Sequence, residues 1–429
     1  MRYLPLNNNL FKFNRKRFVS QLPAGSMAVF VSAELMPRNG DQFYPFRQQS
    51  DFFYLTGTEQ DNTCLLLFPD CPNQAYREIL FVESYDSHKA TWEGEKLSVE
   101  KAKSVSGIER ILFNDQFNAV LQEVTGYCGK IYLNNNEYIK YHSEVEHKNL
   151  RFARAMKEKF PLHEFHRAAP ILEKLRVIKS ETELELIKTA SDITAKAFKR
   201  VLKKLVPGMN EFEVQAEIEH EFVLNRASGH AYYPIIAGGK NSCVLHYNDN
   251  DKPLQDNELL LLDFGAEYAN YSADLSRTIP VNGHFSQRQK QCYDAVLRVF
   301  RKAVKLYVPG NTIEQINREV WKLMEEEMIT LGLFTKQDVS NQNPDFPLYR
   351  RYLMHGVAHH IGLDVHDVGS KFEPLAPGMV LTCEPGLYIR EENIGIRIEN
   401  DILVTETEPI DLMADIPIEA SEIEQFMNN

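Results

Sequence analysis

The stretch ELLLLDFGAEYANYSADLSRT, residues 258–278, contains four consecutive leucines and places Asp263 directly after them. A short unbroken apolar run predicts a strand that is buried on both faces. Gly265 and the polar residues around it favour a turn, and the alternating run after them would return as the next strand of a hairpin. Such a hairpin would bring Asp263 beside Asp274. Two facing carboxylates repel each other unless they share a proton or a cation, so this stretch predicts a buried acidic site.

The segments around this hairpin occur twice in the sequence. FKRVLKKLVPGMNEFEV (198–214) resembles FRKAVKLYVPGNTIEQI (300–316), and KPLQDNELLLLDFG (252–265) aligns with EPLAPGMVLTCEPG (373–386). Each copy predicts a helix, a Val-Pro-Gly stop, a second helix and a strand that ends in an acid. In this register Glu384 takes the place of Asp263, and Glu399 corresponds roughly to Asp274. The repeat therefore predicts one pseudo-twofold α+β domain with a site between its two halves.

These four acids require positive charge nearby, because burying unpaired carboxylates is costly. One alternative is ordinary salt bridges, for which Arg277, Arg390 and Arg397 are available. A metal site explains better why all four acids lie in apolar strands at matching repeat positions. We therefore expect two divalent cations to balance the four negative charges.

A histidine-rich segment, HGVAHHIGLDVHD (355–367), supplies a further class of metal ligand. Its histidines are His355, His359, His360 and His366. His355 and His359 have HxxxH spacing, but Gly356 stands where an HExxH zinc peptidase has glutamate, so that motif is excluded. A shell of carboxylates with one imidazole favours Mn²⁺, while Co²⁺, Fe²⁺ and Zn²⁺ would also fit. Two such ions would activate a bridging water and polarise a carbonyl group.

The composition places bounds on partners and location. A chain of 429 residues with a net charge of −12 predicts two or three globular domains and argues against nucleic acid as a partner. No apolar run approaches the roughly 18 residues that a membrane span needs, and the N-terminus lacks an apolar signal segment. The six cysteines are scattered without a CxxC pair, which favours reduced thiols and a cytoplasmic location.

The first 165 residues predict a separate α/β domain, because strand-like runs alternate with helical patterns. No catalytic cluster occurs in this region, and Trp92 taken alone predicts packing. Residues 10–22 predict a helix whose cationic side chains form a solvated face. Residues 160–170 predict a linker, and a helix from Ser180 to about 205 opens a second domain over 171–429.

With these residues in view, the chain resembles the M24 metallopeptidases of the pita-bread fold and, within them, the aminopeptidase P group. The resemblance rests on one N-terminal block and five C-terminal blocks. They are YPFRQQSDFFYLTG (44–57), HYNDND (246–251), DFGAEYANYSADLSRT (263–278), HGVAHHIGLDVHD (355–367), EPGLYI (384–389) and GIRIEND (395–401). Ala358 departs from the usual serine or glycine, but it is also small.

The resemblance implies roles for individual residues. The metal ligands would be Asp263, Asp274, His359, Glu384 and Glu399, with Asp274 and Glu399 bridging two ions. Glu384, His366 and His246 would be catalytic, Glu384 accepting a proton from the attacking water and His366 stabilising the oxyanion. The substrate would also contact His355, Tyr388 and Arg397, and Trp92 of a neighbouring subunit would lie at the rim of the site.

The implied activity is hydrolysis of the N-terminal Xaa-Pro bond of peptides by a homodimer or homotetramer. Prolidase, which cleaves Xaa-Pro dipeptides with the same metal shell, remains an alternative. The second alternative is a metal-free relative, either a binding protein or a creatinase-like hydrolase. An assay that compares an Xaa-Pro dipeptide with a tripeptide would separate the first two, and metal analysis would identify the third.

Overall fold

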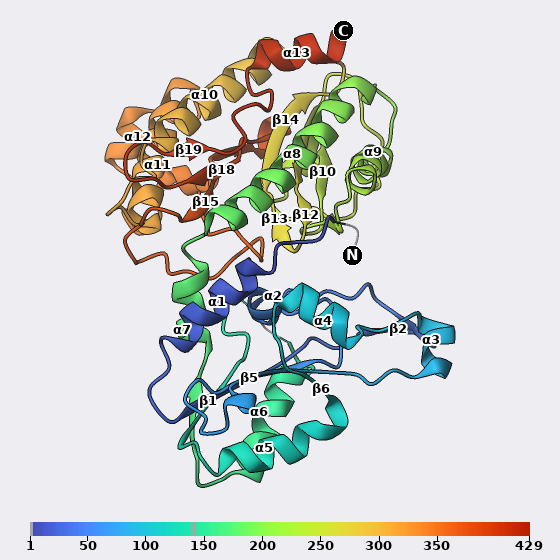
Figure 1. Cartoon of the computed structure of the whole chain (residues 1–429). Helices are drawn as coiled ribbons and strands as arrows, with labels where there is room; N and C mark the ends of the chain where they lie inside the picture. The colour runs from blue at the N-terminus through green and yellow to red at the C-terminus, as the bar shows by residue number, and fades with distance from the viewer. Residues whose placement is uncertain (1–2, 139, 141–142) are drawn as a thin grey trace. The chain divides into compact units, whose positions relative to one another are not determined.

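A computed structural model describes residues 3–138, 140 and 143–429 of the chain (Figure 1). The chain divides into two compact units, residues 3–175 and residues 176–429. Each unit has its own sheets and its own core, and each is described by itself below.

The N-terminal unit is built on a six-stranded mixed sheet with the order β6-β5-β4-β1-β7-β8. The strands are β1 (Ser26–Val31), β2 (Pro37–Asn39), β3 (Gln42–Phe43), β4 (Cys64–Leu67), β5 (Glu78–Val82), β6 (Ile111–Phe113), β7 (Lys130–Leu133) and β8 (Glu164–Arg167). The helices are α1 (Asn9–Val19), α2 (Ser50–Thr56), α3 (Ser87–Glu93), α4 (Val99–Ser106), α5 (Phe117–Thr125), α6 (Lys148–Lys159) and α7 (Ala169–Arg176). The predicted alternation of strands and helices is confirmed.

Both faces of β1 are buried, which explains why all of its residues except Ser26 are apolar. Alternate residues of β1, including Met27 and Val29, join a core cluster with α5 and α6. On the other face Phe30 packs edge-on against Phe18 of α1 at 5.3 Å between ring centroids. Figure 1 shows α1 and α2 on one side of the sheet and α5 and α6 on the other.

Two expectations for this unit are wrong. The predicted linker at residues 160–170 contains strand β8, whose apolar Phe165 pairs with Ile131 of β7 in a parallel ladder. The solvated face predicted for α1 does not include Arg15, which is buried. Its guanidinium donates to Glu78 at 2.6 Å and to the carbonyl oxygens of Leu55 and Ser106 at 2.7 and 2.9 Å, so its buried charge is paired.

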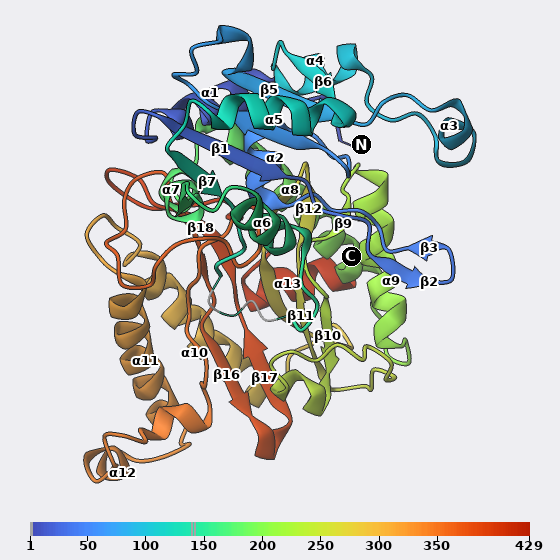
Figure 2. The same cartoon turned by 90° about the horizontal axis from the view of Figure 1, so that it is seen from below.

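The C-terminal unit surrounds several small sheets with long helices. Its strands are β9 (Gly229–His230), β10 (Ile235–Gly238), β11 (Leu259–Phe264), β12 (Ala266–Tyr268), β13 (Tyr271–Ser272), β14 (Leu275–Pro280), β15 (Val380–Cys383), β16 (Gly386–Ile389), β17 (Ile394–Arg397), β18 (Asn400–Leu403) and β19 (Ile410–Asp411). Its helices are α8 (Glu181–Lys204), α9 (Glu211–Leu224), α10 (Gln287–Val304), α11 (Ile313–Thr330), α12 (Lys336–Ser340) and α13 (Ala420–Asn428). The strands form the sheets β10-β11-β14, β13-β12-β9 and β15-β18-β19 and the hairpin β16-β17. Figure 2 shows this hairpin beside β10 and β11.

The helix predicted from Ser180 is confirmed as α8, and the capping box of Ser180 and Glu183 begins it. Matching local structure follows α8 and α10. Gly208 and Gly310 both have φ of +93°, where a side chain would be strained. Gly208 donates to the carbonyl oxygen of Leu254 at 2.8 Å, and Gly310 donates to that of Leu375 at 3.0 Å. The two copies thus share local structure, while a twofold axis between them remains a prediction.

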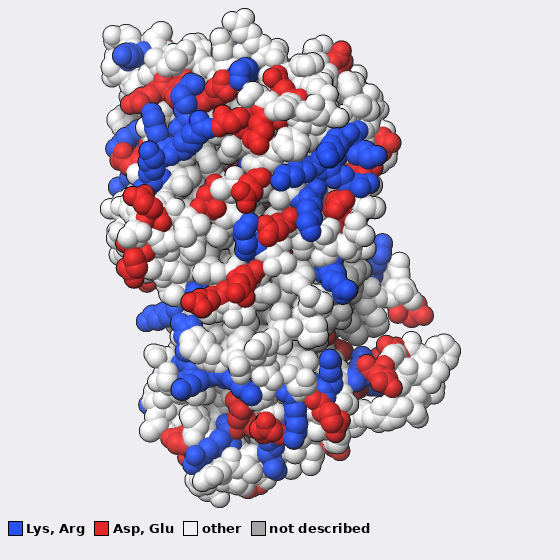
Figure 3. Space-filling view, turned by 45° about the horizontal axis from the view of Figure 1, so that its top comes forward, with Lys and Arg blue, Asp and Glu red and all other residues white. Residues whose placement is uncertain are grey.

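Three surface and core properties complete the description. All six cysteines are unpaired and buried. In the described part of the chain, no helix combines the length and the apolarity needed to cross a bilayer. On the face drawn in Figure 3, acidic and basic side chains are interspersed rather than separated into fields of one sign.

Candidate active site

The hairpin of the C-terminal unit brings the first two acids together. β11 pairs with β14 in antiparallel register, so that Asp263 lies opposite Ser276. Gly265 permits the close return of the chain, since a Cβ there would lie 1.7 Å from the carbonyl oxygen of Ala273. Asp263 and Asp274 therefore meet at one end of a buried sheet, as the sequence predicts.

Tyr232, just before β10, connects the two carboxylates. Its hydroxyl lies 2.6 Å from Oδ1 of Asp263 and 2.5 Å from Oδ1 of Asp274. Strand β10 pairs with β11 so that Ile235 lies opposite Asp263, and this pairing fixes the approach of the tyrosine. The sequence offers no motif that singles out one tyrosine, and Tyr232 was not predicted to belong to the site.

The second pair of acids arrives from the other repeat. Glu399 donates its backbone N–H to the carbonyl oxygen of Ser276 at 3.1 Å, and its carboxylate accepts from the Ser276 hydroxyl at 2.6 Å. Ser276 therefore joins Glu399 to β14, the strand that directly follows Asp274. Glu384 follows β15 directly, and its carboxylate lies 4.0 Å from Nε2 of His359.

Three of the five predicted ligands already form a compact donor set. Ligand atoms of Asp274, His359 and Glu399 all lie within 4.8 Å of one another. Nδ1 of His359 lies 3.0 Å from the carbonyl oxygen of His360, which leaves Nε2 pointing toward Asp274 at 3.4 Å. An imidazole whose Nδ1–H is held by a carbonyl presents Nε2 to a metal in the correct tautomer. The segment around these histidines contains no α-helix, as its glycines predict.

The electrostatics of the site favour the binding of cations. Burial raises the pKa values of Asp274, Glu384 and Glu399, because the charged forms lose their hydration. Burial also opposes the charge of His359, but its contacts with Asp274 and Glu384 raise its pKa to about 9. Carboxylates in this condition either bind protons or bind metal ions. The buried acids and the oriented imidazole thus fit a site for divalent cations.

Arg397 organises the side of the site next to Asp263. It forms a salt bridge with Asp263 and donates to the hydroxyl of Tyr388 at 2.7 Å. The same hydroxyl lies 2.9 Å from Nε2 of His355. Nδ1 of His355 is 2.7 Å from the carbonyl oxygen of Gly356. His355 also approaches Glu384 at 3.6 Å, but this contact is not an ion pair, because burial lowers the pKa of His355 to about 4.

The remaining predicted residues have different environments. The ring of His366 is exposed and lies 4.4 Å from that of His359, measured between centroids. His246 is also exposed, and it interacts electrostatically with His355, which places it near that ring. Trp92 lies on α3 of the N-terminal unit with 78% of its surface exposed, so the packing role predicted from the bare residue is wrong.

Further residues position the site and were not predicted to do so. The indole N–H of Trp321 donates to the carbonyl oxygen of His355 at 3.2 Å. One turn earlier on α11, Asn317 accepts from the N–H of Val357 at 2.8 Å. Asp401, which is buried, accepts from the N–H of Asp274 at 3.2 Å. Asp401 lies within the GIRIEND block, so its motif was found although its role was not.

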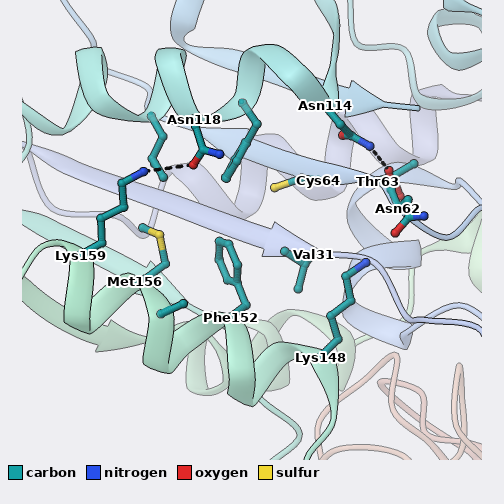
Figure 4. A pocket seen from close by; sticks show the side chains of 13 residues that line it. Val31, Asn62, Thr63, Cys64, Asn114, Asn118, Lys148, Phe152, Met156 and Lys159 are labelled. Carbon is teal, nitrogen blue, oxygen red and sulfur yellow. Dashed lines mark hydrogen bonds between the residues drawn. The ribbon is translucent and has the colours of Figure 1, made fainter. Parts of the chain in front are cut away.

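The N-terminal unit contains a hollow of its own, with a volume of about 390 Å³ between α5 and α6 (Figure 4). Apolar residues such as Phe152 and Met156 form much of its wall. The ammonium group of Lys159 donates a hydrogen bond to the side-chain oxygen of Asn118 at 3.0 Å, and that of Lys148 donates one to the hydroxyl of Ser32 at 3.2 Å. No aspartate, glutamate or histidine is among its described lining residues. The hydrolytic chemistry therefore belongs to the C-terminal unit.

Comparisons with known proteins agree with this division. Residues 185–406 match metallopeptidase family M24, and residues 11–132 match the aminopeptidase P N-terminal domain. The chain is 36% identical to the Xaa-Pro aminopeptidase of Haemophilus influenzae, with 97% of each chain covered.

Solved structures give the same result. A variant of Escherichia coli aminopeptidase P in complex with substrate has a TM-score of 0.89 and 33% identity, with 99% of each chain covered. Zinc-substituted E. coli aminopeptidase P in complex with product has a TM-score of 0.88 at the same identity and coverage. The chain therefore belongs to metallopeptidase family M24 and, within it, to the aminopeptidase P group, whose fold of an N-terminal domain and a pita-bread catalytic domain it shares.

Proposed function

We propose that this metallo-aminopeptidase hydrolyses the bond between the first residue of a peptide and a proline at the second position. The observation that carries the proposal is the donor set of Asp274, His359 and Glu399, within 4.8 Å of one another in a chain of the aminopeptidase P group. Asp263 and Glu384 would complete the ligands of two divalent ions. When bound, such ions supply an activated water and polarise the scissile carbonyl.

The residues of the chain divide the remaining tasks. Glu384 has a partly accessible carboxylate and would accept the proton of the attacking water. His366 and His246 are exposed and would contact the substrate, with His366 donating to the oxyanion. Arg397 holds Tyr388 and Asp263 in place, and Tyr388 in turn fixes the ring of His355. These contacts orient the groups that surround the peptide before it binds.

Proline at the second position suits this arrangement. An Xaa-Pro bond is a tertiary amide without an N–H, and proline restricts the residue before it. A peptidase that depends on hydrogen bonds to an extended backbone loses a donor at this bond. A site that acts on the carbonyl itself, beside a pocket shaped for the ring, does not need that donor.

Prolidase is the nearest alternative activity. The match of residues 11–132 to the aminopeptidase P N-terminal domain and the Xaa-Pro aminopeptidase relative favour the longer substrates. The test is to compare an Xaa-Pro dipeptide with an Xaa-Pro-Yaa tripeptide at equal concentration. We expect faster release of the first residue from the tripeptide, and cleavage of the dipeptide alone would reverse the assignment.

Mn²⁺ is the ion we propose for the native enzyme, because carboxylates with a single imidazole favour it. Elemental analysis of protein purified without added metal, followed by reconstitution with Mn²⁺, Co²⁺, Fe²⁺ or Zn²⁺, would test this. We expect about two ions per chain and the highest activity with Mn²⁺. Full peptidase activity in metal-free protein would contradict both the metal and the mechanism.

We also propose that the enzyme is a homodimer or homotetramer in which Trp92 of one chain borders the site of another. The support for this is that Trp92 has 78% of its surface exposed, which leaves its indole accessible to a neighbouring chain. Solution mass and the activity of Trp92→Ala test the two parts. We expect an oligomer whose Trp92→Ala form keeps its metal but cleaves short peptides more slowly, whereas a fully active monomer would contradict the proposal.

A cytoplasmic location completes the proposal. Its support is the set of six buried, unpaired thiols, which a reducing compartment preserves. Fractionation of cells that express the full chain would test it, and recovery of the enzyme outside the cytoplasmic fraction would contradict it.

A further inference from the structure

A hollow of about 470 Å³ lies beside the candidate active site in the C-terminal unit. It is lined by Lys240, Asn241, Cys243, Val244, Leu245, Met354 and Arg390. Leu245 directly precedes His246, and Met354 directly precedes His355. The hollow is therefore continuous in sequence with the two histidines to which we assign substrate contacts.

One wall of the hollow is held in place by a buried carboxylate. The wall is the 3₁₀ helix η3 (Gly239–Cys243), which follows β10. One oxygen of Glu211 accepts from the side chain of Asn241 at 3.2 Å, and the other accepts from the hydroxyl of Tyr247 at 2.8 Å. This carboxylate therefore fixes the wall itself at Asn241 and the chain after it at Tyr247.

The wall also rests directly on strand β17. A Cβ on Gly395 would lie 2.1 Å from the carbonyl oxygen of Ser242, so only glycine allows η3 to approach this closely. The hollow is therefore preformed, which lowers the cost of binding a ligand there.

The hollow combines positive charge with exposed apolar surface. Lys240 and Arg390 are both exposed, and neither forms a salt bridge in the described part of the chain. Of the acids that come after Arg390, Glu392 forms a salt bridge with Arg288, and Glu391 forms one with Arg351 while it also interacts electrostatically with Arg390. No acid is among the described lining residues, although the whole chain carries a net charge of −12.

The hollow is also lined by exposed apolar side chains. Val244 is 52% exposed and Met354 is 37% exposed. Exposed apolar side chains beside charged groups without salt-bridge partners are typical of a binding surface.

We propose that this hollow is a subsite for the part of the peptide after proline, and that Lys240 and Arg390 bind a carboxylate there. The inference rests on the proposed function, because it assigns a substrate preference to the same site. The carboxylate is either the C-terminus of a short peptide or an acidic side chain. An extended chain advances about 3.3–3.6 Å per residue, and two lining residues of the hollow directly precede His246 and His355, so a group one or two residues after proline would reach it.

The experiment compares four peptides that begin with the sequence Xaa-Pro-Ala and differ only at their C-terminal end. In three of them Xaa-Pro-Ala is followed by an alanine, glutamate or lysine residue that carries a C-terminal amide. The fourth has the alanine residue with a free C-terminal carboxylate. We expect the two carboxylate-bearing peptides to have kcat/KM about threefold to tenfold above the neutral amide, mostly through KM. The lysine peptide should fall below the neutral amide. A preference for the free acid alone assigns the carboxylate to the C-terminus, and a preference for glutamate assigns it to a side chain.

Variants connect this preference to the two cations. Lys240→Gln and Arg390→Gln should each reduce the ratio of kcat/KM between acidic and neutral peptides, and the double variant should bring it to about one. Arg390→Lys should keep most of the preference, and Arg390→Glu should favour the lysine peptide. Lys203→Gln is the matched control, because Lys203 is an exposed lysine of α8 outside the hollow.

Equal kcat/KM for all four peptides in the wild type would overturn the subsite while leaving the proposed function intact. An unchanged preference in the double variant would also overturn it. Failure of the wild type to cleave any of the four would overturn the proposed function, and the subsite with it.

Discussion

The hydroxyl of Tyr232 lies 2.6 Å from a carboxylate oxygen of Asp263, and the same hydroxyl reaches Asp274 at 2.5 Å. A phenol carries one proton and can donate to only one of these oxygens. The second contact is favourable only if the other carboxyl group is protonated or if a cation draws the oxygens together. The raised pKa of Asp274, caused by burial, agrees with the first condition in the metal-free protein.

Replacing Tyr232 with phenylalanine should therefore weaken metal binding without unfolding the protein. Outer partners of metal ligands contribute about tenfold to a hundredfold in affinity, and we expect a loss near the lower value. Titration of metal-free protein with Mn²⁺ would measure it. Tyr233→Phe is the matched control, because Tyr233 is 80% exposed. Equal affinity in the two variants would exclude Tyr232 from the site.

Asp274→Asn and Glu399→Gln should each abolish activity and lose at least one ion. Both acids belong to the compact donor set, and a bridging ligand serves two ions at once. Elemental analysis and a peptidase assay on the same preparation would check this. Glu326→Gln on the exposed face of α11 serves as the control. Near-normal turnover with full metal content in either variant would contradict the two-metal assignment.

His366→Ala should keep its metal and lose most of its rate. The residue lies beside His359 but outside the predicted ligand set. Removing one oxyanion donor typically lowers kcat by about 10²–10³. The exposed His284 provides a control substitution to alanine. Wild-type kcat, or loss of the metal, would show that the oxyanion role is misassigned.

The metal-free protein should lose stability as the pH rises. Burial raises the folded-state pKa values of Asp274, Glu384 and Glu399 above their unfolded values, and the acidic neighbours of His359 raise its pKa to about 9. A group with a raised folded pKa keeps its full contribution below the unfolded pKa and loses it as pH passes the folded value. The stability of the metal-free protein should therefore fall between about pH 4 and about pH 9.

Thermal unfolding of metal-free and Mn²⁺-loaded protein across this window would measure the effect. We expect Tm of the metal-free form to fall with pH, and the increase in Tm upon adding Mn²⁺ to grow with pH, because ligands must be deprotonated to bind. If Mn²⁺ increased Tm by the same amount at every pH in this range, the prediction would be wrong.

Trp321→Phe should act on the substrate rather than on the metal. Phenylalanine keeps an aromatic ring against Tyr349, which stacks on Trp321 at 5.6 Å, but removes the N–H that holds the carbonyl of His355. Loss of one such hydrogen bond is worth about 1 kcal/mol, and we expect KM to rise about fivefold with little change in kcat. Reduced metal content would instead indicate a structural role for Trp321.

Much of the catalytic unit could be predicted because its signals are strong. The leucine run before Asp263 clearly predicts a buried strand, and the repeat locates Glu384 and Glu399 relative to that strand. The N-terminal strands were found for the same reason, since β1 is apolar at nearly every position.

The failures have physical causes as well. Tyr232 acts through a single hydroxyl, and nothing in its local sequence distinguishes it from the adjacent Tyr233. Arg15 appears on a basic helix that sequence alone places in solvent, but Glu78, 63 residues away, balances its charge, and the carbonyl oxygen of Leu55, 40 residues away, accepts a hydrogen bond from it. Strand β8 is polar at every position except Phe165 because it lies at the edge of its sheet. Long-range contacts decided each of these cases.

The burial of all six cysteines also determines how the folded chain meets thiol reagents. Burial raises the pKa of Cys128 and that of Cys292 to about 11, and it shifts the pKa of Cys64 in the same direction. Alkylation needs an accessible thiolate, so modification of the native chain must wait for local or global opening. The cysteines are spread over both compact units. The order in which they become alkylated would therefore record which unit opens first, without any introduced label.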